Sequence, residues 1–169
     1  MTDSFETPSL ERLKADLLAL GEEVLAETEA VGLLGSWARG DPHPGSDLDF
    51  FVIVADEDWS PEFENRWWRL LRERVANKYG RRMDLIVYTI LDLKRIATWY
   101  VLGMADEGLV VYDKGQVRDL FRQIVQRAIA CGLVKKYCRG RHREHAYWTM
   151  GRELEPGEII AFALEGYDP

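Results

Sequence analysis

The sequence is poor in several features that would assign it to a special class of protein. Two cysteines among 169 residues are too few for a disulfide framework. No apolar run approaches the ~20 residues that a membrane-spanning helix needs, and the first residues lack the basic stretch and apolar core of a signal peptide. We therefore expect a soluble protein of the reducing cytoplasm, with no membrane partner.

Basic residues are also in deficit. The chain has 22 Lys and Arg against 29 Asp and Glu, a net charge of −7, which argues against broad binding to nucleic acid and leaves room only for a local patch. We interpret the most basic stretch as a solvated helix end, where cations suit the helix dipole, with contact to RNA or a nucleoside triphosphate as the alternative. This stretch contains Lys135, Lys136, Arg139, Arg141 and Arg143.

Histidine is scarce as well, with three residues in the chain. Residue types that bind zinc do gather in one region, at Cys131, Cys138, His142 and His145. The two cysteines, however, are spaced too widely for the usual zinc knuckle. We therefore expect no zinc site there.

What is present is the pattern of a globular protein, with 47% hydrophobic and 30% charged residues. Hydrophobic periodicity and turn residues predict an alternation of helices and strands without an internal repeat. Helices are expected from Thr7-Pro8 to about 24, from Ser60-Pro61 to Gly80, from Thr89 past 101, and from about 116 to 137. Strands are expected at 31–34, 48–54, 83–88 and 109–112. The apolar run 159–164 fits either state.

Two carboxylates stand side by side at the start of the second predicted strand. Asp47 and Asp49 are two residues apart, so their side chains project to the same face. Two like charges at such a short distance repel one another, and a divalent cation is the simplest way to neutralise them. Oxygen ligands of this kind favour Mg²⁺ or Mn²⁺. Asp84, at the start of the third predicted strand, joins them if that strand lies beside the second.

A turn suited to phosphate precedes these acids. Gly35 and Ser36 follow the first predicted strand. Glycine lets the backbone approach a ligand closely, and the turn aims free N–H groups at an anion. The Ser36 hydroxyl adds a further donor. A phosphate cradle that faces paired carboxylates is the apparatus of phosphoryl or nucleotidyl transfer.

The stretch Gly35-Ser36-Trp37-Ala38-Arg39-Gly40, five residues, then Ser46-Asp47-Leu48-Asp49 and an apolar strand resembles the signature of the DNA polymerase beta-type nucleotidyltransferase superfamily. The short chain looks most like its minimal, antitoxin-like members. The resemblance implies an α+β fold with a small mixed β-sheet flanked by helices and a helical C-terminal extension. We place the core domain at 1–113 and a C-terminal helix and tail at 114–169.

The resemblance also implies roles for single residues. Gly35 and Ser36 would contact the nucleotide phosphates. Asp47, Asp49 and Asp84 would be the catalytic carboxylates and metal ligands, and Asp84 would also help to deprotonate the acceptor. Two further residues are assigned to nucleotide binding with open alternatives: Arg39 would contact phosphate or form an ion pair that fixes the loop, and Ser46 would brace that loop.

The implied function is transfer of a nucleoside monophosphate from a nucleoside triphosphate, with ATP expected, to a hydroxyl of a protein, an RNA or a small molecule. Minimal members of the superfamily are often paired with a HEPN-type toxin, so such a toxin is an expected partner, as is a second copy of the chain. Two alternatives stay open: a non-catalytic, antitoxin-like binding partner, and a nucleotide-binding regulator. Retention of all three acids favours the enzyme.

Overall fold

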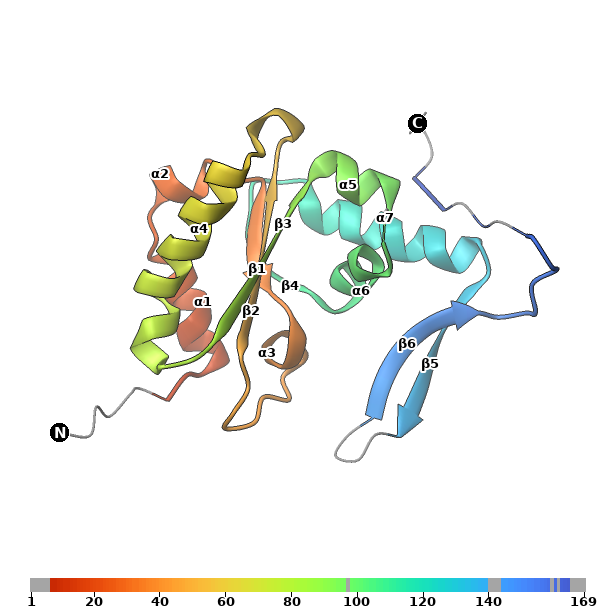
Figure 1. Ribbon diagram of the computed structural model, residues 1–169, viewed down its shortest axis with the longest axis horizontal. Helices are drawn as coiled ribbons and strands as arrows, with labels where there is room; N and C mark the ends of the chain where they lie inside the picture. The colour runs from red at the N-terminus through yellow and green to blue at the C-terminus, as the bar shows by residue number, and fades with distance from the viewer. Residues whose placement is uncertain (1–6, 97, 140–143, 159, 161, 165–169) are drawn as a thin grey trace. The chain divides into compact units, whose positions relative to one another are not determined.

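The computed structural model describes residues 7–96, 98–139, 144–158, 160 and 162–164. Its elements alternate between helices and strands along the chain (Figure 1). The helices are α1 (Leu10–Leu18), α2 (Glu22–Leu25), α3 (Gly35–Arg39), α4 (Pro61–Arg74), α5 (Ile90–Arg95), α6 (Trp99–Glu107) and α7 (Val117–Ala130), with 3-10 turns η1 (Asp56–Asp58) and η2 (Ala76–Tyr79). The strands are β1 (Ala30–Leu33), β2 (Leu48–Val54), β3 (Met83–Thr89), β4 (Leu109–Asp113), β5 (Leu133–Arg139) and β6 (Glu144–Met150).

The chain divides into two compact units. The first comprises residues 1–91 and 107–118, and the second comprises residues 92–106 and 119–169. None of the described helices is both long and apolar enough to cross a membrane.

The first unit is built on a four-stranded mixed sheet in the order β3-β2-β1-β4. β1 runs antiparallel to β2 and to β4, whereas β2 and β3 are parallel. The predicted small mixed sheet flanked by helices is therefore confirmed, as are the four strands predicted for it.

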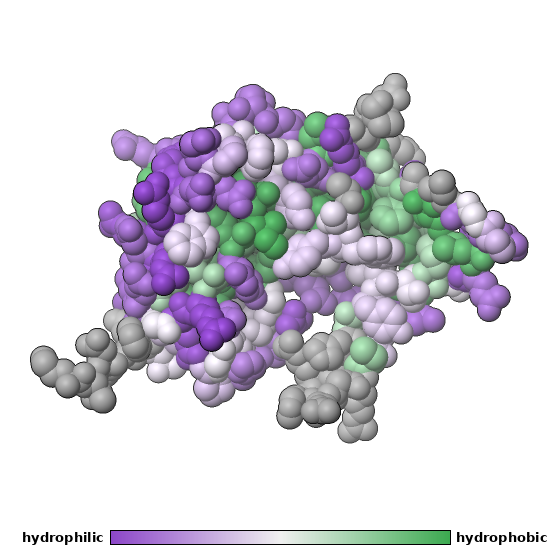
Figure 2. All heavy atoms as spheres, in the orientation of Figure 1, coloured by the Kyte–Doolittle hydropathy of each residue, from purple (hydrophilic) through white to green (hydrophobic). Residues whose placement is uncertain are grey.

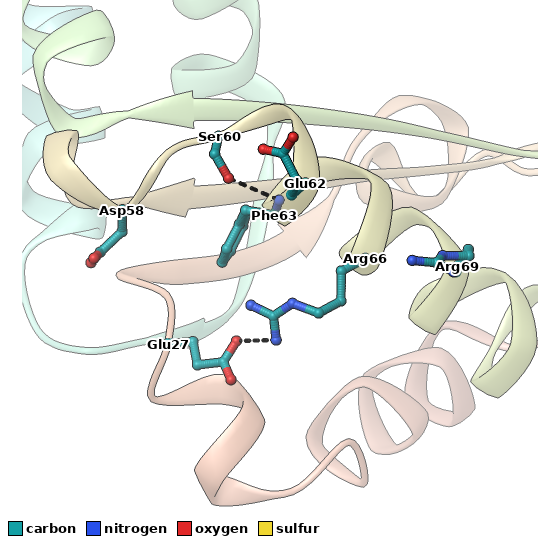
Figure 3. Close-up of a pocket in the computed structure, with 7 residues that line it drawn as sticks. All are labelled: Glu27, Asp58, Ser60, Glu62, Phe63, Arg66 and Arg69. Atoms are coloured by element: carbon teal, nitrogen blue, oxygen red, sulfur yellow. Dashed lines mark hydrogen bonds and ion pairs between the residues drawn. The ribbon is translucent and has the colours of Figure 1, made fainter.

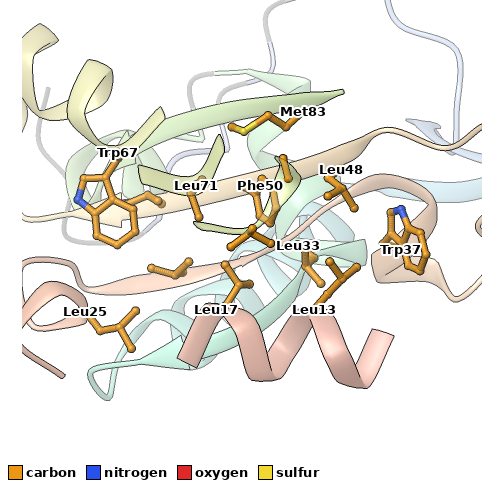
Figure 4. Close-up of a cluster of buried hydrophobic side chains, with 14 of the residues drawn as sticks. Leu13, Leu17, Leu25, Leu33, Trp37, Leu48, Phe50, Trp67, Leu71 and Met83 are labelled. Atoms are coloured by element: carbon orange, nitrogen blue, oxygen red, sulfur yellow. The ribbon is translucent and has the colours of Figure 1, made fainter. Parts of the chain in front are cut away.

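Helices α1, α2 and α4 lie along one face of this sheet (Figure 1). Between them and the sheet lies a cluster of buried side chains, drawn in Figure 4, that includes Leu13 and Leu17 of α1, Phe50 of β2, and Trp67 and Leu71 of α4. Burying one such side chain contributes about 1.5–3 kcal/mol. The outer surface of α4 is hydrophilic (Figure 2), as expected for an amphipathic helix.

The N-terminal helix is shorter than predicted. It begins at Leu10, because the Ser9 side chain, rather than that of Thr7, accepts a hydrogen bond from the Arg12 N–H. It ends at Leu18, and Gly21, with φ of 101°, separates it from the short helix α2. The prediction of one helix to residue 24 is wrong because a glycine with positive φ breaks the helical path. By contrast, α4 begins at Ser60-Pro61 as predicted, and the Ser60 side chain caps it by accepting a hydrogen bond from the Phe63 N–H.

The single helix predicted from Thr89 is two helices. α5 ends at Arg95, and Ile96 has φ of 48°, a left-handed conformation that interrupts the helix. The backbone N–H of Val101 then donates to the Thr98 hydroxyl at the start of α6. Tyr100 is 54% exposed, whereas Val101 is buried. Ala97, within the predicted helix, lies outside the described residues.

The helix predicted to reach Tyr137 ends at Ala130. Gly132, with φ of 89°, follows it, and the chain continues as the antiparallel hairpin β5–β6. The C-terminal extension is therefore a helix followed by a hairpin. Lys135 and Lys136 lie on a strand, so their interpretation as a helix end is wrong. The described residues of the run 159–164 belong to no helix or strand, and 159 and 161 lie outside them.

A buried carboxylate links α1 to η2, the turn that follows α4. Asp16 is 7% exposed and accepts hydrogen bonds from Lys78 Nζ at 2.7 Å and from the Tyr79 hydroxyl at 2.5 Å. Burial pushes the pKa of Asp16 upward, but these two donors outweigh it and lower the pKa below 3.8. Burial and the bond to Asp16 raise the pKa of Tyr79 to about 12.

We expect Asp16→Asn to destabilise the protein by roughly 1.5–3 kcal/mol at pH 7, the range for hydrogen bonds to a charged group. A lowered pKa contributes stability above the ordinary value of 3.8, and this stability is lost as the pH falls through the folded-state pKa. The difference between parent and variant should therefore vanish in acid. Urea denaturation at pH 7 and pH 3 measures it, with Asp58→Asn as an exposed control. Equal stabilities at pH 7 would show that the network contributes nothing.

Candidate active site

The pairing of β2 with β3 brings two of the predicted carboxylates together. Asp49 and Asp84 are each the second residue of their strand, and they are direct partners in the parallel register. Partners on adjacent strands project to the same face. The prediction that the third strand lies beside the second is confirmed. Asp47 is exposed and immediately precedes β2.

The electrostatics of Asp49 reflect this crowding. Its side chain is partly buried, and burial is the largest cause that raises its pKa above 3.8. The negative charges of Asp84 and Asp47 raise the pKa further, while the Arg39 guanidinium lowers it. The three carboxylates therefore form one repulsive cluster, the condition that a divalent cation would relieve.

Gly35 fits against this cluster. Its φ of 63° lies in the left-handed region that favours glycine. A Cβ atom at this position would overlap Oδ2 of Asp49. The preceding backbone N–H, that of Leu34, donates to the Asp49 carbonyl at 2.8 Å. The turn that leaves β1 is thus seated directly on Asp49.

Ser36 lies in the first turn of the five-residue helix α3. It is partly exposed, and no partner of its hydroxyl is recorded in the described part of the chain. The next side chain, Trp37, is 5% exposed and packs in the core, which fixes α3 to the sheet. The Ser36 hydroxyl is therefore available to a ligand on a rigidly held turn.

Arg39 forms ion pairs in this structure. Its guanidinium donates to Oε2 of Glu107 at 3.3 Å, and its Nε lies 3.5 Å from Oδ1 of Asp41. Of the two alternatives for Arg39, the ion pair is the one present here. Sequence reasoning did not identify Glu107, because an acid near the end of a helix carries no signal that it pairs with a residue so distant in the chain.

The loop before β2 is braced from within. The His43 N–H donates to the Ser46 hydroxyl at 2.9 Å, and Ser46 is 5% exposed. Arg81, in the approach to β3, donates to the carbonyl of Pro44. Ser46 therefore braces the loop as predicted, and its contact with nucleotide stays a prediction. His43 is exposed, as expected for a loop residue.

The carboxylates suit a hard cation in chemistry, although their side chains do not yet converge. Among the residues that the structure describes, no group of three or more His, Cys, Asp or Glu side chains is positioned to hold one ion. Joint ligation by Asp47, Asp49 and Asp84 therefore requires their side chains to rotate toward a common point. The backbone register that places Asp49 beside Asp84 is already present.

A separate pocket of about 590 Å³ lies at the opposite end of β2, where η1 leads into α4 (Figure 3). Arg66 pairs with Glu27 at 2.6 Å within it, and Ser60 accepts from the Phe63 N–H. Its lining combines charges of both signs, of which Arg66 and Glu27 form an ion pair. None of the predicted site residues belongs to this lining.

We expect Gly35→Ala to destabilise the protein more than Gly40→Ala does. Both glycines have positive φ, so each substitution costs about 1–2 kcal/mol in backbone strain. Nothing lies within 4 Å of a Cβ built on Gly40, whereas one on Gly35 meets Asp49. Thermal unfolding of both variants tests this difference. Equal losses would show that Asp49 can move aside without cost.

We also expect Asp49→Asn to stabilise the protein at pH 7 in the absence of divalent cations. A raised pKa contributes stability below 3.8 that is lost as the pH rises through the folded-state pKa, and asparagine removes this loss. The advantage of the variant should grow from pH 4 upward and then level off. Thermal unfolding across pH, with Asp58→Asn as the control acid, measures it. A variant less stable than the parent at pH 7 contradicts this account.

Comparison with known proteins adds independent findings. No curated protein matches the sequence. The solved structures with similarity include a toxin–antitoxin complex with AMP-PNP, at 21% identity and a TM-score of 0.47 over 64% of this chain and 79% of that one. A tri-AMPylated Shewanella oneidensis HEPN toxin in complex with MNT antitoxin matches at 18% identity with a TM-score of 0.44, over 66% of this chain and 79% of that one. A putative nucleotidyltransferase from Sulfolobus solfataricus matches at 18% identity with a TM-score of 0.35, over 66% of this chain and 93% of that one.

These structural similarities are too low to support a statement about activity or partners. The family model is decisive instead. The model of the nucleotidyltransferase domain matches residues 11–103, which is more than half of the chain and includes the Gly35-Ser36 turn and all three carboxylates. The chain therefore belongs to the nucleotidyltransferase domain family.

Proposed function

We propose that the protein transfers a nucleoside monophosphate from a nucleoside triphosphate, with ATP as the expected donor, to a hydroxyl group of an acceptor. The observation that carries this proposal is the in-register pair Asp49 and Asp84, seated against the Gly35 turn in a nucleotidyltransferase domain. It joins a carboxylate cluster to a turn with an available hydroxyl donor. Those are the two halves of a nucleotidyl-transfer site.

Asp47, Asp49 and Asp84 would hold the divalent cation, Mg²⁺ or Mn²⁺. Their oxygens are the hard ligands that these ions prefer. Burial, and after it the negative charges of Asp84 and Asp47, raises the pKa of Asp49, and a bound cation would offset both effects. When bound, the cation supplies electrostatic stabilisation of the charge on the phosphoryl oxygens. Asp49 gains most from its presence because it is the least exposed of the three to solvent.

The residues of the chain bind and orient the reactants. The Gly35 backbone and the Ser36 hydroxyl contact the phosphates, where the absence of a Cβ permits close approach. Arg39 reaches a phosphate only if it leaves Glu107 and Asp41, so its ion pairs compete with nucleotide. An Arg that moves between these partners would link nucleotide binding to the position of the loop.

Asp84 takes the proton of the acceptor. As the acceptor oxygen forms its bond to the α-phosphorus, the bond from that phosphorus to the bridging oxygen breaks and pyrophosphate leaves. The proton of the hydroxyl passes to the Asp84 carboxylate. Asp84 suits this step because it is exposed, whereas Asp49 is partly buried beside it.

The acceptor is to be found by experiment. The protein is incubated with each labelled nucleoside triphosphate and with Mg²⁺ or Mn²⁺. The candidate acceptors are tRNA, aminoglycosides and the proteins encoded by neighbouring genes, among them any HEPN-type toxin. Label transferred to one acceptor class identifies it. A protein that binds nucleotide and transfers to none of them would support the regulator alternative, and one that neutralises a toxin without nucleotide would support the non-catalytic antitoxin.

We expect Asp84→Asn to reduce transfer by at least ~100-fold, the scale of losing a positioned base. Asp47 and Asp49 remain to bind the nucleotide and cation, so nucleotide affinity should stay within a few fold of the parent. Calorimetry and single-turnover transfer separate the two effects. The control is Asp58→Asn, an exposed acid at the other end of β2. Transfer at the parental rate would move the role of base to another acid, with Asp92 the next to examine.

A further inference from the structure

The charge of the chain is strongly segregated. Residues 122–152 contain eight Lys and Arg and a single acidic residue, Glu144. The whole chain has a net charge of −7, so everything outside this stretch sums to −14. The described part of the stretch comprises most of α7 and the hairpin β5–β6. A polyanion would therefore be repelled by most of the protein and attracted to this region.

One face of the hairpin is anchored within its own unit. Lys135 and Trp148 are cross-strand partners, and both contact Oδ2 of Asp106, in α6. The Lys135 ammonium lies 2.6 Å from this oxygen, and the Trp148 indole N–H donates to it at 3.1 Å. Since successive side chains on a strand alternate between faces, the neighbours of these two residues point the other way.

The opposite face of the hairpin presents a cation beside an aromatic ring. Lys136 and Tyr147 are cross-strand partners there; Lys136 is exposed, and Tyr147 is 46% exposed. No ion pair of Lys136 is recorded within the described residues. Val134, on the same face, is 37% exposed. The surface over the two strands is mostly pale or green in Figure 2.

Exposed large hydrophobic side chains gather in the same unit. Seven of the ten recorded among the described residues belong to it, although it is the smaller of the two units. They are Trp99, Tyr100, Ile129, Val134, Tyr137, Tyr147 and Leu154. Exposed apolar groups in this concentration mark an interaction surface.

We propose that the outward face of the β5–β6 hairpin, with Lys136 and Tyr147 at its centre and Val134 beside them, binds single-stranded RNA. Exposed rings stack on unpaired bases, and the neighbouring cation attracts the phosphates. Lysine at the centre of the surface disfavours a protein partner, because protein–protein interfaces are depleted of it. RNA is favoured over DNA since unpaired loops and ends are ordinary features of RNA. This inference is independent of the proposed transfer reaction.

The experiment measures binding of the full-length protein to an oligouridine about 12 nucleotides long, within the span of a small single-strand site, without nucleoside triphosphate. Fluorescence anisotropy across salt concentrations gives affinity and salt dependence. Tyr147→Ala should weaken binding about tenfold, whereas Tyr147→Phe, which keeps the ring, should stay near the parent. Lys136→Glu should weaken binding and make its salt dependence shallower.

Matched controls come from the first unit. Arg69→Glu changes the net charge as Lys136→Glu does, on the exposed surface of α4, and Trp59→Ala removes an exposed ring that is 45% accessible. Both should bind RNA like the parent. Thermal unfolding verifies that every variant is folded.

Several outcomes overturn the proposal. Absence of RNA binding at low salt does so, as does an equal effect of Arg69→Glu and Lys136→Glu. Tighter binding of duplex RNA would exclude base stacking, and tighter binding of the matching DNA would assign the surface to DNA. A change of oligomeric state in Tyr147→Ala with RNA affinity intact would assign it to a contact between copies of the chain.

Discussion

The parallel pairing of β2 with β3 is the constraint on which the candidate site depends. It places Asp49 directly beside Asp84, an arrangement that two like charges do not favour by themselves. The pairing is maintained by the core, since Phe50 and Phe51, the next residues of β2, are both fully buried and lie on opposite faces of the strand. A strand buried on both faces cannot shift its register without exposing its apolar residues. The fold thus holds together charges that would otherwise separate.

The turn after β1 depends on the same pair. Gly35 occupies the space beside Asp49 that a side chain would need, so the phosphate-binding half and the carboxylate half of the site form one geometric unit. Arg39, one turn further on, lowers the pKa of Asp49 while it is bound to Glu107 and Asp41. The site is therefore tuned by a few groups that are close in space. Such repulsion between neighbouring groups is usual at functional sites, where the residues that activity needs reduce stability.

Much of this site could be predicted because its signals are local. The apolar run of β2 and the spacing of Asp47 and Asp49 are contained in a few consecutive residues. Asp84 could be assigned because it is an acid at the start of the next predicted strand. The break at Ile96 could not be predicted, since a branched residue rarely adopts positive φ and nothing nearby signals it. The prediction missed the hairpin for another reason. It continued the helical pattern of Ile124 and Ala128 to Tyr137, whereas β5 is defined by its antiparallel pairing with β6, the next strand along the chain.

This difference also explains why the reaction class can be inferred and the acceptor cannot. The family model ends at residue 103, so the chemistry that it describes is confined to the elements with local signals. Hairpin β5–β6 lies beyond that point, and its exposed Tyr137 and Tyr147 are not part of the buried core. Within a family that shares one reaction, elements outside the common domain are free to differ with the molecule that is recognised. The acceptor of this protein should therefore be sought through the surface of its second unit, and the reaction through the carboxylates of its first.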